Sequence, residues 1–303
     1  MSTPTADAIR ESIPDSVYAE YYPPRTALEA AFRAVRRAKV PQVPNIVLSL
    51  REELRQPEPD LMRAADLVEQ DLAMTGQVLK AINSPFMANR AKISSVRRAV
   101  GLIGLRRLTN LVTAVTFSRL MVGERKGGAR QIFGFTQEQA RVSAAVAALA
   151  HEVTADEAYL FGMMQNVGNL IFADLIKGYE NEWTLYALAN PQNLMNSERR
   201  ALSTDHPTVG FLMAGTWHLP EAVVLAIYYQ NTLEVPAAFD LHLRSLMAVS
   251  KLTRLLLALR RGIEDTPALL DQRDWSLQEL DISLDDWERF VAHHLANDEH
   301  NAE

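Results

Sequence analysis

The sequence predicts an all-α fold, and three observations support this prediction. The apolar residues follow a helical pattern along nearly the whole chain, with the spacing of one face of an amphipathic helix. Val, Ile and Thr never alternate with polar residues for long, as they would in half-buried strands. Prolines, together with Asn, Asp and Ser residues suited to capping, divide the chain into segments of helical length.

The first residues differ from the rest of the chain. Residues 1–25 are polar and end in the motif YYPPR, and a helical pattern follows over 26–38. We therefore predict a leader over residues 1–35 that is partly disordered and then helical. The prolines of VPQVPN at 40–45 end this helix, because each proline removes a backbone donor and restricts the residue before it.

Short capped helices are predicted next. Residues suited to capping precede successive apolar runs, and each is expected to start a helix: Asn45, Asp60, Asp71 and Ser94 or Ser95. The step at 83–85, which contains a proline, stops the third of these helices. Gly104 is expected to close the fourth, and a further amphipathic helix is predicted over 105–120.

The segment GERKGGAR at 123–130 is the clearest internal boundary, because its charges and glycines predict a flexible linker. Helices are predicted after it over 136–153, 156–176, 205–218, 220–232 and 240–262. The remaining residues predict a charged C-terminal extension over 241–303 that is helical.

The composition describes an ordinary soluble globular protein, with 48% hydrophobic and 22% charged residues. The absence of cysteine excludes disulfide scaffolds, thiolate metal sites and a cysteine nucleophile. The N-terminus has no apolar core and does not resemble a signal peptide. The longest run without Asp, Glu, Lys or Arg covers 158–173, which is shorter than a membrane span of about 20 residues. We expect a cytoplasmic protein without a membrane partner.

Charge is distributed unevenly along the chain. The formal net charge is −6, yet the window 72–123 contains no Asp or Glu and eight Lys and Arg residues. Six cations of this window form a candidate patch for an anion or a partner: Arg90, Lys92, Arg97, Arg98, Arg106 and Arg107. Such asymmetry indicates an anionic partner, which could be nucleic acid, a nucleotide or the acidic part of the same protein.

The stretch LFGMMQNVGNLIFADL at 160–175 is the most informative segment. One broad face of the predicted helix is apolar, and the opposite side gathers Gln165, Asn166 and Asn169. A helix this apolar is expected to be mostly buried. Its amides therefore form either a solvent-exposed edge, a set of satisfied amides between helices, or the wall of a polar pocket.

Five segments carry a resemblance to a known family. They are VPQVPNIVLSLREEL at 40–54, LMRAADLVEQDLAMTGQVLKAINSPF at 61–86, ISSVRRAVGLIGLRRLTNLV at 93–112, AYLFGMMQNVGNLIFADL at 158–175 and DHPTVGFLMAGTWHLPEAVVLAIYYQN at 205–231. In this order they resemble the HDOD domain, a bacterial signalling module related to the HD phosphohydrolase superfamily. The resemblance implies a two-lobed helical domain over 36–240, with an N-terminal lobe at about 36–122 packed on an HD-like lobe at about 135–240.

The resemblance also locates an ancestral metal site, and this sequence lacks most of its ligands. Catalytic HD relatives hold a divalent metal with imidazoles and a carboxylate. Gln165 and Asn166 stand where those relatives have the His-Asp pair, and the helix around Glu138 has no histidine. Gln230 and Asn231 stand where paired histidines are frequent, so only His206 remains at a motif position.

The sequence therefore predicts a regulatory protein of bacterial signal transduction that is not an enzyme and needs no metal or cofactor. It would act by binding a partner protein, and the vacant positions could also hold an anionic ligand. Two alternatives stay open: nucleic-acid or nucleotide binding through the basic lobe at 72–123, and residual metal-dependent phosphohydrolase activity. The vacant ancestral positions are Gln165, Asn166, His206, Gln230 and Asn231.

Overall fold

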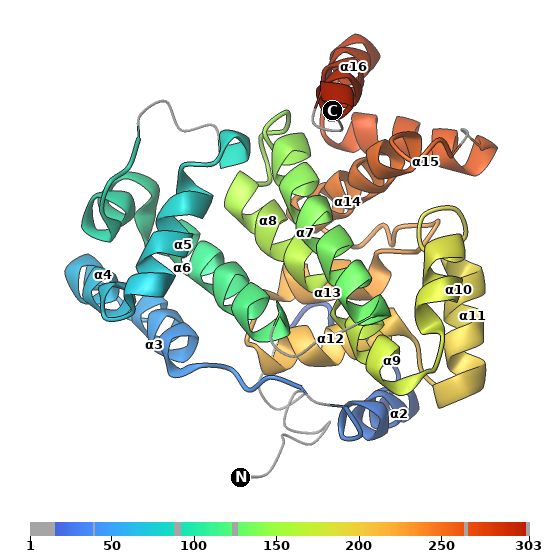
Figure 1. Cartoon of the computed structure of the whole chain (residues 1–303), viewed down its shortest axis with the longest axis horizontal. Coiled ribbons are helices and arrows are strands. Elements are labelled where there is room, and N and C mark those ends of the chain that lie inside the picture. Colours follow the sequence, from blue (N-terminus) through green and yellow to red (C-terminus); the bar gives the residue numbers. More distant parts are fainter. Residues whose placement is uncertain (1–15, 39, 88–91, 123–126, 264–265, 301–303) are drawn as a thin grey trace.

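The structure, a computed structural model, describes residues 16–38, 40–87, 92–122, 127–263 and 266–300. Within these ranges all regular secondary structure is helical, which confirms the predicted fold class (Figure 1). No helix in the described ranges is long and apolar enough to cross a membrane. Residues 1–15 of the predicted leader and Arg90 of the predicted patch lie outside the described residues.

The helices of the first half build a small lobe with its own core. Its elements are α3 (Asn45–Leu54), α4 (Leu61–Glu69), α5 (Leu72–Ile82), η2 (Pro85–Met87) and α6 (Val96–Val122). They lie together on the left of Figure 1 and enclose one hydrophobic cluster, which Leu50, Val78 and Leu108 share. Ala144 and Ala155, from the two helices that follow, belong to the same cluster and join this lobe to the rest of the molecule.

A second and larger cluster forms the core of the other lobe. It is built by η1 (Ala19–Tyr21), α2 (Arg25–Val35), α7 (Gly128–Ala147), α8 (Ala155–Met164), α9 (Val167–Leu175), α10 (Tyr179–Tyr186), α11 (Pro191–Leu202), α12 (His206–Thr216), α13 (Glu221–Tyr229), α14 (Leu241–Leu259), α15 (Pro267–Glu279) and α16 (Leu284–His300). Tyr18 and Tyr21 of the leader pack edge-on against Phe239, so the described end of the leader contributes to this core.

Most of the predicted start and stop signals act as expected. Asp60 and Asp71 accept hydrogen bonds from backbone N–H groups in the first turns of α4 and α5, and Ser95 accepts one from the N–H of Arg98. Gly104 has φ of 81°, so it interrupts α6 as predicted. Asn45 is a correction: Pro44 occupies the N-cap and the Asn45 side chain makes no capping bond.

Two predicted elements were wrong in extent, and two helices were not predicted. The predicted helix over 156–176 is two helices, α8 and α9, which meet at Gln165 and Asn166. Residues 123–126 of the predicted linker lie outside the described residues, and residues 128–130 belong to α7, which begins at Gly128. Helices α10 and α11, between residues 179 and 202, were not predicted at all.

Candidate functional site

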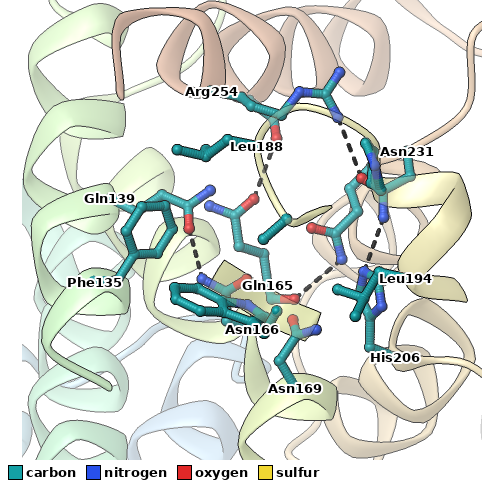
Figure 2. A pocket seen from close by; sticks show the side chains of 15 residues that line it. Phe135, Gln139, Gln165, Asn166, Asn169, Leu188, Leu194, His206, Asn231 and Arg254 are labelled. Carbon is teal, nitrogen blue, oxygen red and sulfur yellow. Dashed lines mark hydrogen bonds between the residues drawn. The ribbon is translucent and has the colours of Figure 1, made fainter. Parts of the chain in front are cut away.

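The five vacant positions converge on one small cavity. Gln165 and Asn166 come from the junction of α8 and α9, His206 from the first turn of α12, and Gln230 and Asn231 from the end of α13. The cavity has a volume of about 30 Å³, which is the space of about one water molecule. Figure 2 shows Gln165, Asn166, His206 and Asn231 around this space, beneath Arg254 of α14.

A glycine brings two of the contributing helices into backbone contact. A Cβ built on Gly168 of α9 would lie 2.2 Å from the carbonyl oxygen of His206 and 2.7 Å from its Cα. Only a residue without a side chain allows α9 to approach α12 this closely. Asp205 caps α12 by accepting a hydrogen bond from the N–H of Thr208 at 3.0 Å. Together these contacts fix His206 beside the α8–α9 junction.

A chain of hydrogen bonds crosses the site from a buried cation to a buried carboxylate. Arg254 Nη1 donates to Asn231 Oδ1 at 3.3 Å, and Asn231 Nδ2 lies 2.8 Å from His206 Nε2 (Figure 2). His206 Nδ1 lies 2.8 Å from Glu198 Oε2. A guanidinium can only donate, so the amide oxygen of Asn231 must face Arg254 and its NH₂ must face the imidazole.

This geometry determines the protonation state of His206. Since Asn231 donates to Nε2, that nitrogen must be the acceptor, and Nδ1 must carry the proton that Glu198 accepts. Glu198 also accepts from the backbone N–H of His206 at 2.8 Å and from the hydroxyl of Tyr179. Asn169 in turn donates to the Tyr179 oxygen at 2.7 Å. In this arrangement the Nε2 lone pair of His206 is already used by Asn231.

The remaining amides are bonded mostly to one another and to the backbone. Asn166 donates to Gln139 Oε1 at 2.6 Å, and Gln230 donates to the carbonyl oxygen of Gln165 at 3.0 Å. Ser250 donates to Gln165 Oε1 at 3.2 Å, whereas the buried Gln165 Nε2 has no hydrogen-bond partner. Of the three readings of these amides, the exposed edge is excluded, because Gln165 is fully buried and Asn166 is 7% exposed.

Two buried cations on α14 determine the electrostatics next to the cavity. Burial lowers the pKa of Arg254 to about 10. Burial, and then the neighbouring charge of Arg254, lower the pKa of Lys251 to about 7. Lys251 Nζ donates to the carbonyl oxygen of Thr232 at 2.6 Å and lies 5.6 Å from the centre of the Trp275 ring. Positive charge therefore comes from the protein itself at this site.

These side chains do not fit a divalent metal. The polar side chains of the wall are mostly neutral amides, and its one imidazole has no free lone pair. A divalent metal needs deprotonated or lone-pair ligands in tetrahedral or octahedral arrangement. The guanidinium of Arg254 would repel a cation. No group of three or more His, Cys, Asp or Glu residues suited to a metal occurs in the ranges that the structure describes.

Sequence reasoning missed two residues at the ends of this chain of bonds, Glu198 and Arg254. Glu198 lies on α11, a helix that the Asn190-Pro191 start signal could have predicted. Glu198 lies on the buried face of α11, together with Leu194 and Met195. Arg254 lies in the buried part of α14, among apolar residues and the buried polar residues Lys251 and Thr253. A charge inside a buried helix was the available signal for Arg254.

The six predicted cations do not form one continuous free patch. Arg97 pairs with Asp66 and Glu69, and Arg107 pairs with Asp156 at 2.7 Å. Acidic side chains of the same chain therefore neutralise part of this positive charge. Lys92, Arg98 and Arg106 have exposed side chains.

A groove of about 1,410 Å³ runs between the two lobes, away from the small cavity. Phe86 of the small lobe stacks on Tyr159 of α8 with ring centres 5.3 Å apart, and both line the groove. Lys80 and Arg141 also line it, while Glu138 is its acidic member. The groove offers far more space than the cavity at the α8–α9 junction.

Comparison with known proteins gives one family. The model of the HDOD domain matches residues 40–233. An uncharacterized protein of Treponema pallidum (strain Nichols) is 26% identical over 218 residues, which cover 69% of this chain and 41% of that protein. The chain therefore corresponds to about two fifths of that relative's length.

Solved structures share the fold. An HDOD domain protein of unknown function from Geobacter sulfurreducens has a TM-score of 0.63 and 23% identity over 90% of this chain and 94% of that one. A protein of Shewanella amazonensis SB2B named as a candidate phosphohydrolase has a TM-score of 0.62, with 20% identity over 87% and 93%. One of Marinobacter aquaeolei VT8 named as a candidate signal transduction protein has a TM-score of 0.60, with 19% identity over 90% and 63%.

Proposed function

Because this chain belongs to the HDOD domain family, we propose that it is a regulatory protein of bacterial signal transduction that acts by binding and not by catalysis. The observation that carries this proposal is the state of His206, whose Nε2 accepts a hydrogen bond from Asn231. A histidine in this state has no lone pair to give to a metal. A candidate signal transduction protein with this fold supports the proposed class.

The rest of the site fits the same proposal. Metal-binding histidines usually donate their other N–H to a carboxylate, which orients the ring, and the pair of His206 and Glu198 has this arrangement. In this chain the other side of the His206 ring faces the amide of Asn231, which is hydrogen-bonded to Arg254. We infer that the outer support of an ancestral metal site persists, while the positive charge of Arg254 stands in for that of the ion.

Binding would occur outside the small cavity. A volume of about 30 Å³ admits a water molecule but no phosphodiester substrate. The groove between the lobes, at about 1,410 Å³, has space for a segment of a partner protein. The buried amides would then have a structural role, and the partner protein would be recognised in the groove between the lobes.

Metal content and turnover test the proposal together. Protein purified without chelator is expected to contain far less than stoichiometric Mg, Mn, Fe or Zn by mass spectrometry. Added Mn²⁺ should not produce hydrolysis of bis-p-nitrophenyl phosphate above that of the matched His206→Gln variant, because the side chain at position 206 offers no metal ligand in either protein. Stoichiometric metal with turnover that His206→Gln abolishes would contradict the proposal.

A further inference from the structure

A separate cavity lies where the small lobe meets the turn after α12. It has a volume of about 480 Å³ and is lined by Leu48, Arg51, Glu52, Arg55, Gln56 and His218. All of these except His218 belong to or directly follow α3, and His218 follows the last residues of α12. This cavity shares no lining residue with the site around His206.

Arg51 is a buried cation without a counter-ion. The residue is 9% exposed, yet its guanidinium makes no hydrogen bond or ion pair with any described part of the chain. Nε and Nη2 are both buried and have no partner. Burying a charge without compensation costs several kcal/mol or more, so a buried arginine is ordinarily paired. A hydrogen-bond partner for the guanidinium of Arg51 must therefore come from outside the described residues.

Two further basic groups face the same space. Arg55 directly follows α3, one turn after Arg51. Burial, and then the charge of Arg55, lower the pKa of Arg51 to about 10. Burial, and then Arg55 and Arg51, lower the pKa of His218. Glu52 is the one carboxylate of the lining, and its exposed side chain makes no bond to Arg51. The described surroundings of the cavity are therefore cationic.

His218 has φ of 52°, a left-handed conformation that disfavours residues other than glycine and asparagine by about 1–2 kcal/mol. Glycine is the usual residue at this position after a helix. Ser203 and Asp281 have the same conformation, and at His218 this turn after α12 places the imidazole beside the cavity.

We propose that Arg51, Arg55 and His218 form a binding site for the phosphate group of a small molecule. The guanidinium fork of arginine matches the oxygens of a phosphate, and Arg51 lines the cavity without an acceptor from the described residues. The cavity volume is more than ten times the ~30 Å³ of one water molecule. A phosphorylated molecule therefore fits better than a bare ion.

Inorganic phosphate is the probe for a direct test with the full chain. Calorimetry and melting curves are recorded with increasing phosphate, and with chloride at matched ionic strength. We expect Arg51→Met to weaken phosphate binding about tenfold or more, since it removes charge-assisted bonds. Without phosphate the variant should melt no lower than the wild type, because methionine keeps the apolar stem and removes an unpaired buried charge.

Arg200→Met is the matched control, because Arg200 is exposed and lies outside the cavity. It should bind phosphate as the wild type does. Phosphate also stabilises proteins in general by exclusion from their surface. The control variant should show this general effect unchanged, which separates it from binding in the cavity. Equal phosphate responses in Arg51→Met and the wild type would overturn the site. Acetate binding as tightly as phosphate would overturn the assignment of the ligand.

Discussion

Replacing Gly168 by alanine is expected to reduce the free energy of unfolding by about 3 kcal/mol, the upper part of the range for overpacked interiors. The new Cβ would lie 2.2 Å from the carbonyl oxygen of His206 and 2.8 Å from its carbonyl carbon. These are backbone atoms that cannot rotate away, so α9 and α12 must separate. Urea unfolding monitored by circular dichroism measures the loss.

Gly134→Ala is the matched control for this substitution. Gly134 lies inside α7, and a Cβ built there meets nothing within 4 Å. Alanine is a better helix former than glycine, so the control should gain about 0.5–1 kcal/mol. If both variants gained stability, the close contact between α9 and the backbone of His206 would be wrong.

Glu198→Ala is expected to cost about 4 kcal/mol of unfolding free energy. Glu198 is fully buried and accepts from three donors: the Tyr179 hydroxyl, His206 Nδ1 and the backbone N–H of His206. Each buried donor left without an acceptor costs about 1–3 kcal/mol. Chemical denaturation gives the value, and near-ultraviolet circular dichroism reports the environment of Tyr179.

Glu198→Gln separates the charge from the volume of this side chain. The glutamine fills the same space and keeps one acceptor oxygen, so the loss should be about half that of the alanine variant. A loss below about 1 kcal/mol in Glu198→Ala would show that these donors find water or other partners, and the buried chain of bonds would then not stabilise the lobe.

The sequence predicted the helical class and many helix boundaries because local signals decide them. Asp60, Asp71 and Ser95 bond to the helix ends that follow them, and Gly104 takes the left-handed region that only glycine adopts readily. Asn45 failed as a cap because Pro44 occupies that position. These outcomes depend on a few neighbouring residues, which a sequence displays directly.

The break at Gln165 and Asn166 could not be predicted in the same way. The apolar pattern continues through it, and the contact of Gly168 with the backbone of His206 joins residues far apart in the sequence. The convergence of the five vacant positions followed from the family resemblance. The charges that complete the site, Glu198 and Arg254, come from helices outside the resembling segments.

The central claim is that the lone pair of His206 Nε2 is occupied by Asn231, so that the ancestral ligand is no longer available. Nitrogen-15 NMR of histidine-labelled protein, with His206 assigned by comparison with His206→Gln, tests this most directly. At neutral pH we expect a neutral ring with the proton on Nδ1 and Nε2 as the hydrogen-bonded acceptor, unchanged by stoichiometric Mn²⁺. A proton on Nε2, or saturable broadening of the His206 signals by Mn²⁺, would contradict the account.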